Sequence, residues 1–162
     1  MMRLAALTFA AIASGAFSMA IAAPARAQQE AGGEAEGPHH LSLVIAATDI
    51  REEDETAFTL GIDYEYRVSE LLGLGFVAEH AFGEVDSTTL IAAADVHLWQ
   101  GFAIQLGPGV EFAEGEAFLM GRIGTIYEVE LGSGFTIAPQ FHYDFSDGED
   151  AVVFGAAFGR AF

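Results

Sequence analysis

The chain has 162 residues, with 24 Asp and Glu against 6 Arg, no Lys and no Cys, and 52% of its residues are hydrophobic, including 14 Phe. The length fits one domain behind a targeting segment. The net charge of −18 argues against nucleic acid as a partner. The lack of Cys excludes disulfides, thiolate zinc sites and Cys nucleophiles. Acidic disordered chains are poor in aromatic residues, so these apolar side chains must face a core or lipid.

Residues 1–27 have the pattern of a cleaved secretory signal peptide. Arg3 precedes the apolar run 4–23, and the segment 25–27 (Ala-Arg-Ala) has small residues at the two positions that a signal peptidase reads. A single membrane-anchoring helix is the alternative, disfavoured because Ala, Ser and Gly dominate the run. We expect export through the Sec pathway and cleavage before Gln28, which leaves four Arg against 24 acidic residues and a charge of −20.

The rest of the chain predicts an all-β domain. The polar segment 28–38, rich in Gly, Ala and Glu, is typical of a flexible lead-in. From residue 39 to residue 162 the hydrophobic pattern has period two and is interrupted by short Gly, Asp, Ser and Glu clusters typical of turns. This pattern predicts eight strands, over residues 40–48, 55–68, 72–83, 87–99, 102–112, 119–131, 135–145 and 152–162.

Each predicted strand has one apolar face and one face of glycines and isolated charges. In the second strand, for example, Phe58 and Ile62 lie on the face opposite Thr59 and Asp63. A water-facing sheet would carry more Lys and Asn, so we assign the apolar face to lipid. Aromatic residues mark both rims of that face: Phe58, Phe82, Phe112, Tyr143 and Phe145 at one, and Tyr66, Phe102, Tyr127, Phe135 and Phe162 at the other.

Strand edges cannot stay unpaired in hydrocarbon, so the strands must close on themselves. The prediction is a transmembrane, eight-stranded, antiparallel up-and-down β-barrel, with a soluble periplasmic barrel as the alternative. The tight connections at 69–70, 100–101 and 132–133 match short periplasmic turns, and the acidic segments 49–54, 83–86, 113–116 and 146–150 become the outer loops. These loops lack the ligand spacing of an EF-hand, so diffuse attraction of counterions is favoured over a calcium or magnesium site bridging to lipopolysaccharide.

The chain from His39 to Phe162 resembles the small outer-membrane barrels of Gram-negative bacteria, the group of the OmpA transmembrane domain and OmpX. The resemblance implies an outer-membrane location, contact with outer-membrane lipids, and recognition of the last strand, ending in Phe162, by the barrel-assembly machinery. Members of the group include structural, adhesive and lipid-modifying proteins, so no activity follows. Arg160, Pro108 and Pro139 depart from the pattern; we expect the Arg to reach the interface and the prolines to mark bulges.

The inward charges predict a polar network that fills the lumen. Counting from the turns places Asp95 opposite Gly75 and Gly107, Gly107 opposite Arg122, Arg122 opposite His142, and His142 opposite Gly155. Arg122 would then lie among Asp95, His142, Asp144 and Glu111, and Arg67 among Glu65, His97 and Trp99. With two inward Arg, some of the carboxyl groups should share protons or waters: Asp63, Glu65, Glu79, Asp95 and Glu111.

A structural network is favoured over a proton relay or cation path, because interior ion pairs need no function. A lipid-modifying hydrolase is the weakest alternative: His80 faces lipid near Ser87, but Ser87 points inward and no carboxylate is spaced to orient His80. His39 and His40 are interpreted as an interfacial pair without metal. We thus expect a non-enzymatic outer-membrane protein without cofactor, with a membrane-structural or surface-interaction role; a narrow, porin-like cation-selective pore is the main alternative.

Overall fold

The computed structural model describes residues 37–51 and 55–162. The predicted signal peptide and most of the predicted lead-in fall outside these ranges, as do residues 52–54 of the first acidic loop. Among the described residues, no helix has the length and apolar character needed to span a membrane.

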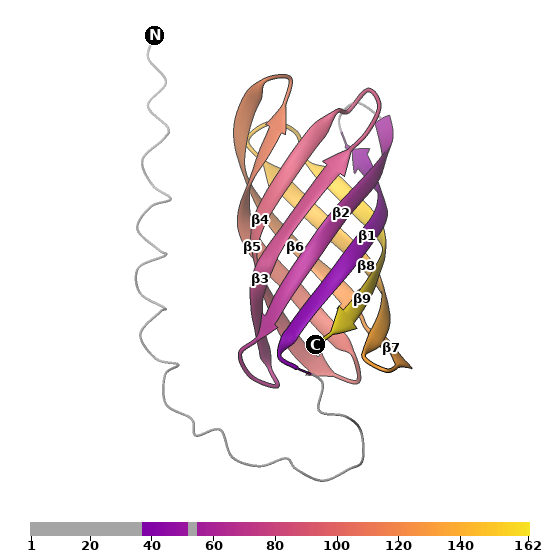
Figure 1. The fold of residues 1–162 in the computed structure, drawn as a ribbon. Helices are drawn as coiled ribbons and strands as arrows, with labels where there is room; N and C mark the ends of the chain where they lie inside the picture. Colours follow the sequence, from indigo (N-terminus) through magenta and orange to yellow (C-terminus); the bar gives the residue numbers. More distant parts are fainter. Residues whose placement is uncertain (1–36, 52–54) are drawn as a thin grey trace, which may run out of the picture. The chain divides into compact units, whose positions relative to one another are not determined.

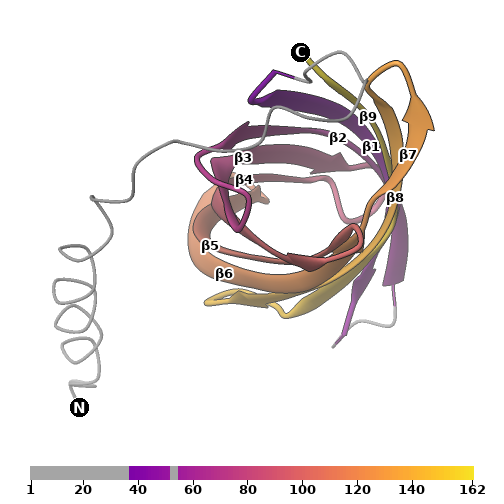
Figure 2. The ribbon, with the colours of Figure 1, turned by 90° about the horizontal axis from the view of Figure 1, so that it is seen from below.

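The described chain is an all-β barrel (Figures 1 and 2). Its strands are β1 (His39–Ile50), β2 (Glu55–Arg67), β3 (Leu72–Ala81), β4 (Ser87–Trp99), β5 (Phe102–Ala113), β6 (Glu116–Tyr127), β7 (Val129–Gly132), β8 (Phe135–Ser146) and β9 (Ala151–Ala161). Neighbours along the chain pair antiparallel, except that β6 and β7 do not pair with each other, and β1 pairs with both β2 and β9. The sheet closes into a barrel through β6, which pairs with β5 on one side and β8 on the other; β7 pairs with β8 alone.

The segments β6 and β7 form one membrane-crossing strand, which gives the barrel its predicted eight. Ile126 pairs with Gln140 and Val129 pairs with Ile137, so the register against β8 is the same on both sides of the break. The break lies opposite Pro139, which has no N–H to donate. The expectation that prolines mark bulges is therefore wrong: Pro108 also pairs in register, opposite Gly121.

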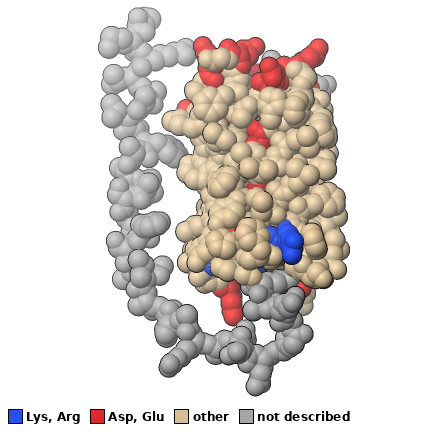
Figure 3. Space-filling view, viewed as in Figure 1, with Lys and Arg blue, Asp and Glu red and all other residues tan. Residues whose placement is uncertain are grey.

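The predicted alternation of faces is confirmed by burial. In β1, Ser42 and Val44 are buried in the barrel, whereas Leu41 and Leu43 are about half exposed on its outside. The same pattern in the other strands produces a continuous apolar belt, and the face seen in Figure 3 carries few charges between its two ends. Most of the predicted rim aromatics are exposed, including Phe58, Phe82, Phe112, Phe145, Tyr66, Tyr127, Phe135 and Phe162.

The single Trp is an exception to the predicted parity. Trp99 was expected to point into the lumen, but it is 65% exposed and its ring lies 5.8 Å from that of Phe102. A register shift in the β4–β5 ladder between His97 and Trp99 turns it outward. Bulges of this kind break the alternation of side chains and are common at barrel rims.

The two ends of the barrel differ in their connections. We call the acidic end the one that carries the connections 51–54, 82–86, 114–115 and 147–150, and the terminal end the one that carries 68–71, 100–101, 133–134 and the C-terminus. Acidic side chains cluster at the acidic end (Figure 3). Three hairpins close with two-residue turns in which both residues have positive φ: Gln100–Gly101, Glu114–Gly115 and Ser133–Gly134. Such turns match the twist of the strands, which explains the tight connections.

The predicted registers are off by two residues in most hairpins. Gly107 does pair with Arg122, but Asp95 pairs with Gly73 and Gln105, and Arg122 pairs with Asp144. His142 lies opposite Gly124 and Val153. A slip of two residues leaves every side chain on its original face, so hydrophobic alternation cannot detect it.

Candidate functional site

A buried Arg joins opposite walls of the barrel in its acidic half. Arg122 Nε donates to Asp144 Oδ1 and its Nη2 donates to Asp144 Oδ2, both at 2.7 Å. The same Nη2 donates to Glu79 Oε2, also at 2.7 Å. Asp144 is on the neighbouring strand β8, but Glu79 is on β3, which β4 and β5 separate from β6. The Arg122 side chain, 1% exposed, therefore crosses the lumen.

Glycines make room for this crossing. Gly107, directly opposite Arg122, has no side chain to compete for the lumen. At Gly124, a Cβ atom would collide with the His142 imidazole and with the Phe141 carbonyl. Glycine in a strand often marks such a close approach.

A second link crosses the lumen closer to the terminal end. Gln105 on β5 donates from Nε2 to Asp63 Oδ2 on β2, at 3.1 Å. Gln105 and Asp95 are both buried, and Gln105 Oε1 and Asp95 Oδ1 have no hydrogen-bond partner. Two acceptor atoms in the middle of the lumen are therefore without a donor.

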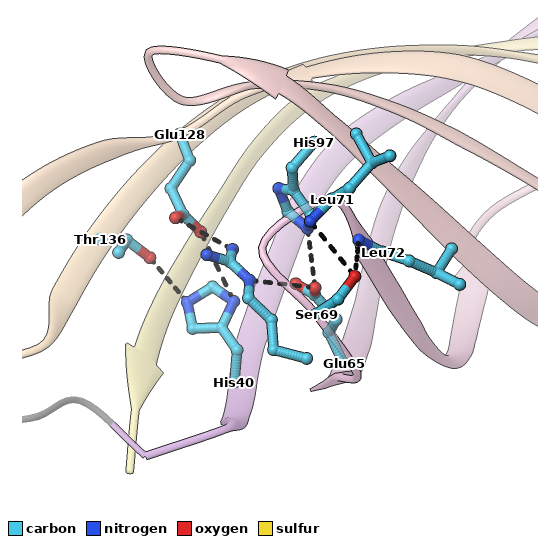
Figure 4. Close-up of polar contacts among 9 residues, drawn as sticks. His40, Glu65, Ser69, Leu71, Leu72, His97, Glu128 and Thr136 are labelled. Atoms are coloured by element: carbon cyan, nitrogen blue, oxygen red, sulfur yellow. Dashed lines mark hydrogen bonds and ion pairs between the residues drawn. The ribbon is translucent and has the colours of Figure 1, made fainter. Parts of the chain in front are cut away.

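At the terminal end, Arg67 and His97 both contact Glu65, as predicted (Figure 4). Arg67 Nε donates to Glu65 Oε1 at 3.2 Å, and His97 Nε2 lies 2.7 Å from the same oxygen. Trp99, the other predicted neighbour of Arg67, points outward instead. Ser69 caps the adjacent turn by accepting the backbone N–H groups of Leu71 and Leu72.

Glu128 and His40 extend this cluster and were missing from the predicted network. Arg67 Nη2 donates to Glu128 Oε1 at 3.5 Å, and the other Glu128 oxygen lies 3.6 Å from His40 Nδ1. His40 Nε2 lies 2.9 Å from Thr136 Oγ1 (Figure 4). The inward parity of Glu128 was visible in the sequence, but its proximity to Arg67 depends on the closed barrel. The interpretation of His39 and His40 as an interfacial pair is also wrong for His40. Of the two, only His39 points outward, where it stacks on Phe162.

The remaining predicted contacts of Arg122 are not formed. No hydrogen bond joins Arg122 to Asp95, His142 or Glu111 in the described chain. His142 is 1% exposed and its Nδ1 has no hydrogen-bond partner. Glu111 instead accepts a hydrogen bond from Ser146 Oγ at 3.2 Å, toward the acidic end. The two-residue register shifts explain why Arg122 does not contact Asp95 or His142. Glu111 is on a hairpin whose register is as predicted, and it lies farther along β5 than Gly107, the residue opposite Arg122.

Small cavities lie on either side of the crossing residues. A cavity of about 10 Å³ touches Glu79 and Asp144 on the acidic side, and one of about 30 Å³ touches Asp63, Glu65 and Asp95 on the terminal side. They share no lining residue. Volumes of this size hold one or a few waters.

The mouth at the acidic end forms a wider vestibule. It has a volume of about 210 Å³, and its lining residues include Glu84, Glu111, Glu114, Glu149 and Phe118. No group of three or more His, Asp or Glu residues within the described ranges is arranged to hold a metal ion.

The histidine proposed for a hydrolase has a different environment from the one expected. Ser87 is buried on the lumen side, as predicted. A carboxylate does lie near His80, however: Asp86 Oδ1 is 3.7 Å from His80 Nε2, and Thr88 Oγ1 is 2.9 Å from His80 Nδ1. The sequence argument missed Asp86 because the turn between β3 and β4 folds it back toward His80.

No protein-family model and no curated protein sequence matches the chain. Among solved structures, the attachment invasion locus protein Ail of Yersinia pestis is 17% identical, with a TM-score of 0.52 over 78% of this chain and 99% of Ail. Ail in complex with the heparin analogue sucrose octasulfate is similar to the same extent, with a TM-score of 0.54. A de novo designed transmembrane β-barrel is 15% identical, with a TM-score of 0.52 over 78% of this chain and 98% of the design. The chain therefore has the fold of the small eight-stranded outer-membrane β-barrels.

Proposed function

We propose that this protein is a closed barrel in the outer membrane of a Gram-negative bacterium, with its acidic end outside, and that it has a membrane-structural or surface-interaction role. The observation that carries the proposal is the combination of an outer apolar belt with a lumen crossed by Arg122. The belt is suited to contact with lipid. Because the Arg122 side chain crosses the lumen, the surface loops are the part of the molecule that a partner can reach.

The described connections at the acidic end indicate what they would attract. They carry Glu84, Asp86, Glu114, Asp147, Glu149 and Asp150, with Arg51 as the only Arg. Ail is known in complex with a sulfated, anionic ligand. The acidic end of this chain would repel such a ligand, so we propose cationic partners, with divalent cations held mainly as diffuse counterions.

The outer belt and the last strand support further proposed contacts. Aromatic rims are typical of barrels that contact membrane lipids at both interfaces, and we propose outer-membrane lipids and lipopolysaccharide as the neighbours of the belt. The last strand, Ala151–Ala161, pairs with β1 and is followed by Phe162, whose backbone exchanges hydrogen bonds with His39. We propose that this strand is the element that the assembly machinery recognises.

Cell fractionation tests the location. The full chain should be found in outer-membrane fractions, and its band should migrate differently on gels before and after boiling. A soluble or inner-membrane band would contradict the proposal, and the apolar belt would then need another partner.

Planar-bilayer recording tests the closed lumen. The protein should show no regular conductance steps, because Arg122 and Gln105 each bridge the lumen. Cation-selective steps that disappear in Asp95→Ala would favour the pore instead.

We propose that the protein is not an enzyme. The buried Ser87 and the outward His80 lie on opposite sides of the wall, which supports this view. Lipid A from cells that express the protein should match that from cells without it. A lipid A change that is lost in His80→Ala would establish a hydrolase.

A further inference from the structure

We propose that the vestibule at the acidic end binds alkylammonium groups, the cationic groups of linear polyamines and of lysine side chains. The inference rests on the proposed function only for the statement that the acidic end faces the medium. The site itself belongs to the folded barrel and can be tested on the purified protein.

The vestibule combines negative charge with an apolar wall. Glu84, Glu111, Glu114 and Glu149 are among its lining residues, and no Arg is. Phe118 lines the same space. An alkylammonium ion has matching parts, because its methylene chain packs on apolar surface while its charged head stays with polar groups.

A buried carboxylate without a full set of partners lies below the vestibule. The narrow cavity of about 10 Å³ shares Ser87, Glu111 and Glu149 with the vestibule and is also lined by Glu79. Glu79 is 4% exposed, and its Oε1 has no hydrogen-bond partner, whereas its Oε2 accepts from Arg122. A buried acceptor without a donor is costly, so a group that brings an N–H donor would be stabilised at this position.

The size of the two spaces favours an ammonium head on a chain over a bare metal ion. A cavity of about 10 Å³ accommodates roughly one water-sized group, and an ammonium has three donors for separate acceptors. A divalent metal would instead need several carboxylates within coordination distance of one point, an arrangement that the described residues do not form. The wider vestibule has room for the rest of the ligand.

Isothermal titration calorimetry on the barrel in a nonionic detergent tests the proposal. Spermidine should bind with saturable, one-site behaviour, and magnesium at the same ionic strength should not reproduce it. Comparison with a tri-lysine peptide separates the two sources of the group: tighter binding of spermidine indicates a free polyamine, and tighter binding of the peptide indicates a protein partner. Equal binding of spermidine and magnesium would overturn the proposal, because it would reduce the vestibule to diffuse counterion attraction.

Paired substitutions on one hairpin locate the site. Glu114→Gln should weaken spermidine binding about tenfold, because it removes one charge-assisted hydrogen bond. Glu116→Gln removes the same charge from an exposed residue of the same hairpin that does not line the vestibule, and it should change affinity by less than about twofold. Equal losses in the two variants would overturn the site.

Two further variants test the two parts of the proposed ligand, its charged head and its methylene chain. Glu111→Gln keeps an acceptor for Ser146 and should still weaken binding about tenfold. Phe118→Ala should weaken spermidine more than methylammonium, which has no chain to pack on the ring; equal effects would contradict the apolar wall. The gel shift on boiling shows that each variant is folded, and fractionation reports separately on membrane location, so failure of the site and failure of the proposed function give different results.

Discussion

The lumen contains two Arg-centred clusters that differ in their access to water. The Arg122 side chain is 1% exposed, and the side chains of its partners Glu79 and Asp144 are 3% and 8% exposed. Arg67 is 39% exposed and contacts Glu65 and Glu128 at 3.2 and 3.5 Å. The same pair of charges is worth much more, and is harder to lose, where water cannot replace either partner. We infer that the Arg122 cluster holds the barrel wall together, whereas the Arg67 cluster joins the strands at the terminal mouth only weakly.

The backbone around each Arg explains this difference. Arg122 lies in the middle of its strand, opposite Gly107 and two residues before Gly124. Arg67 is the last residue of β2, beside the turn at 68–71 and a basin of about 520 Å³ at the terminal end. The position of each Arg along its strand therefore decides which cluster is shielded from water.

Removing Arg122 should produce the largest loss of stability. Arg122→Ala leaves Glu79 and Asp144 buried without their cation, which typically costs about 3 to 5 kcal/mol. Urea unfolding of the barrel in phospholipid bilayers, followed by the fluorescence of the single Trp99, measures the change.

A charge-free version of the cluster is the control for this variant. The triple change Arg122→Met, Glu79→Gln and Asp144→Asn should recover most of the lost stability, because no buried charge remains unpaired. A loss of less than about 1 kcal/mol for Arg122→Ala alone would show that water reaches the cluster.

The space beside Arg122 should be the next most sensitive feature. Gly124→Ala places a methyl group against the His142 imidazole and the Phe141 carbonyl and should cost about 1 to 3 kcal/mol. Gly121→Ala, on the other side of Arg122 in the same strand, meets only the Gly107 carbonyl oxygen, at 4.0 Å, and should be neutral or slightly stabilising. The same urea titration compares the two variants, and equal effects would contradict the packing described here.

Removing Arg67 should cost less than either change. Glu65 keeps His97 at 2.7 Å when Arg67 is replaced by Ala, and Arg67 is partly exposed, so the loss should be about 1 kcal/mol. Glu128→Gln, which removes only the longer contact, should cost still less. A loss for Arg67→Ala as large as that for Arg122→Ala would remove the distinction between the two clusters.

The alternation of residues was sufficient to predict the fold. Period-two patterning with glycines on one face and aromatics on the other has few solutions apart from a closed membrane barrel. The same reasoning placed the turns within a residue or two, because Gln100–Gly101 and Ser133–Gly134 have the composition that tight hairpins require. The β4–β5 bulge that turns Trp99 outward left no mark in the pattern.

The sequence predicted which residues belong to the polar network better than it predicted which of them contact one another. All nine inward charged or polar residues chosen from the sequence lie in the lumen or at its mouths, but parity cannot distinguish registers that differ by two residues. The partner of Arg122 across the lumen, Glu79, was therefore placed in the network without being joined to Arg122. The link between Glu128 and His40 depends on barrel closure, which brings β1 close to the β6–β7 strand although β8 and β9 lie between them.

Added salt should change the contributions of the two clusters to stability by different amounts. This is the smallest of the expected effects, but the most specific. At about 0.5 M NaCl the screening length is only a few ångströms in water, and added ions reach exposed charges but not buried ones. The stability difference between the native barrel and Arg67→Ala should then shrink by a few tenths of a kcal/mol, whereas the difference for Arg122→Ala should stay constant. Urea is the suitable denaturant because it adds no ions of its own. If salt reduced both differences equally, water and ions would have access to Arg122, and the crossing could not keep the lumen closed.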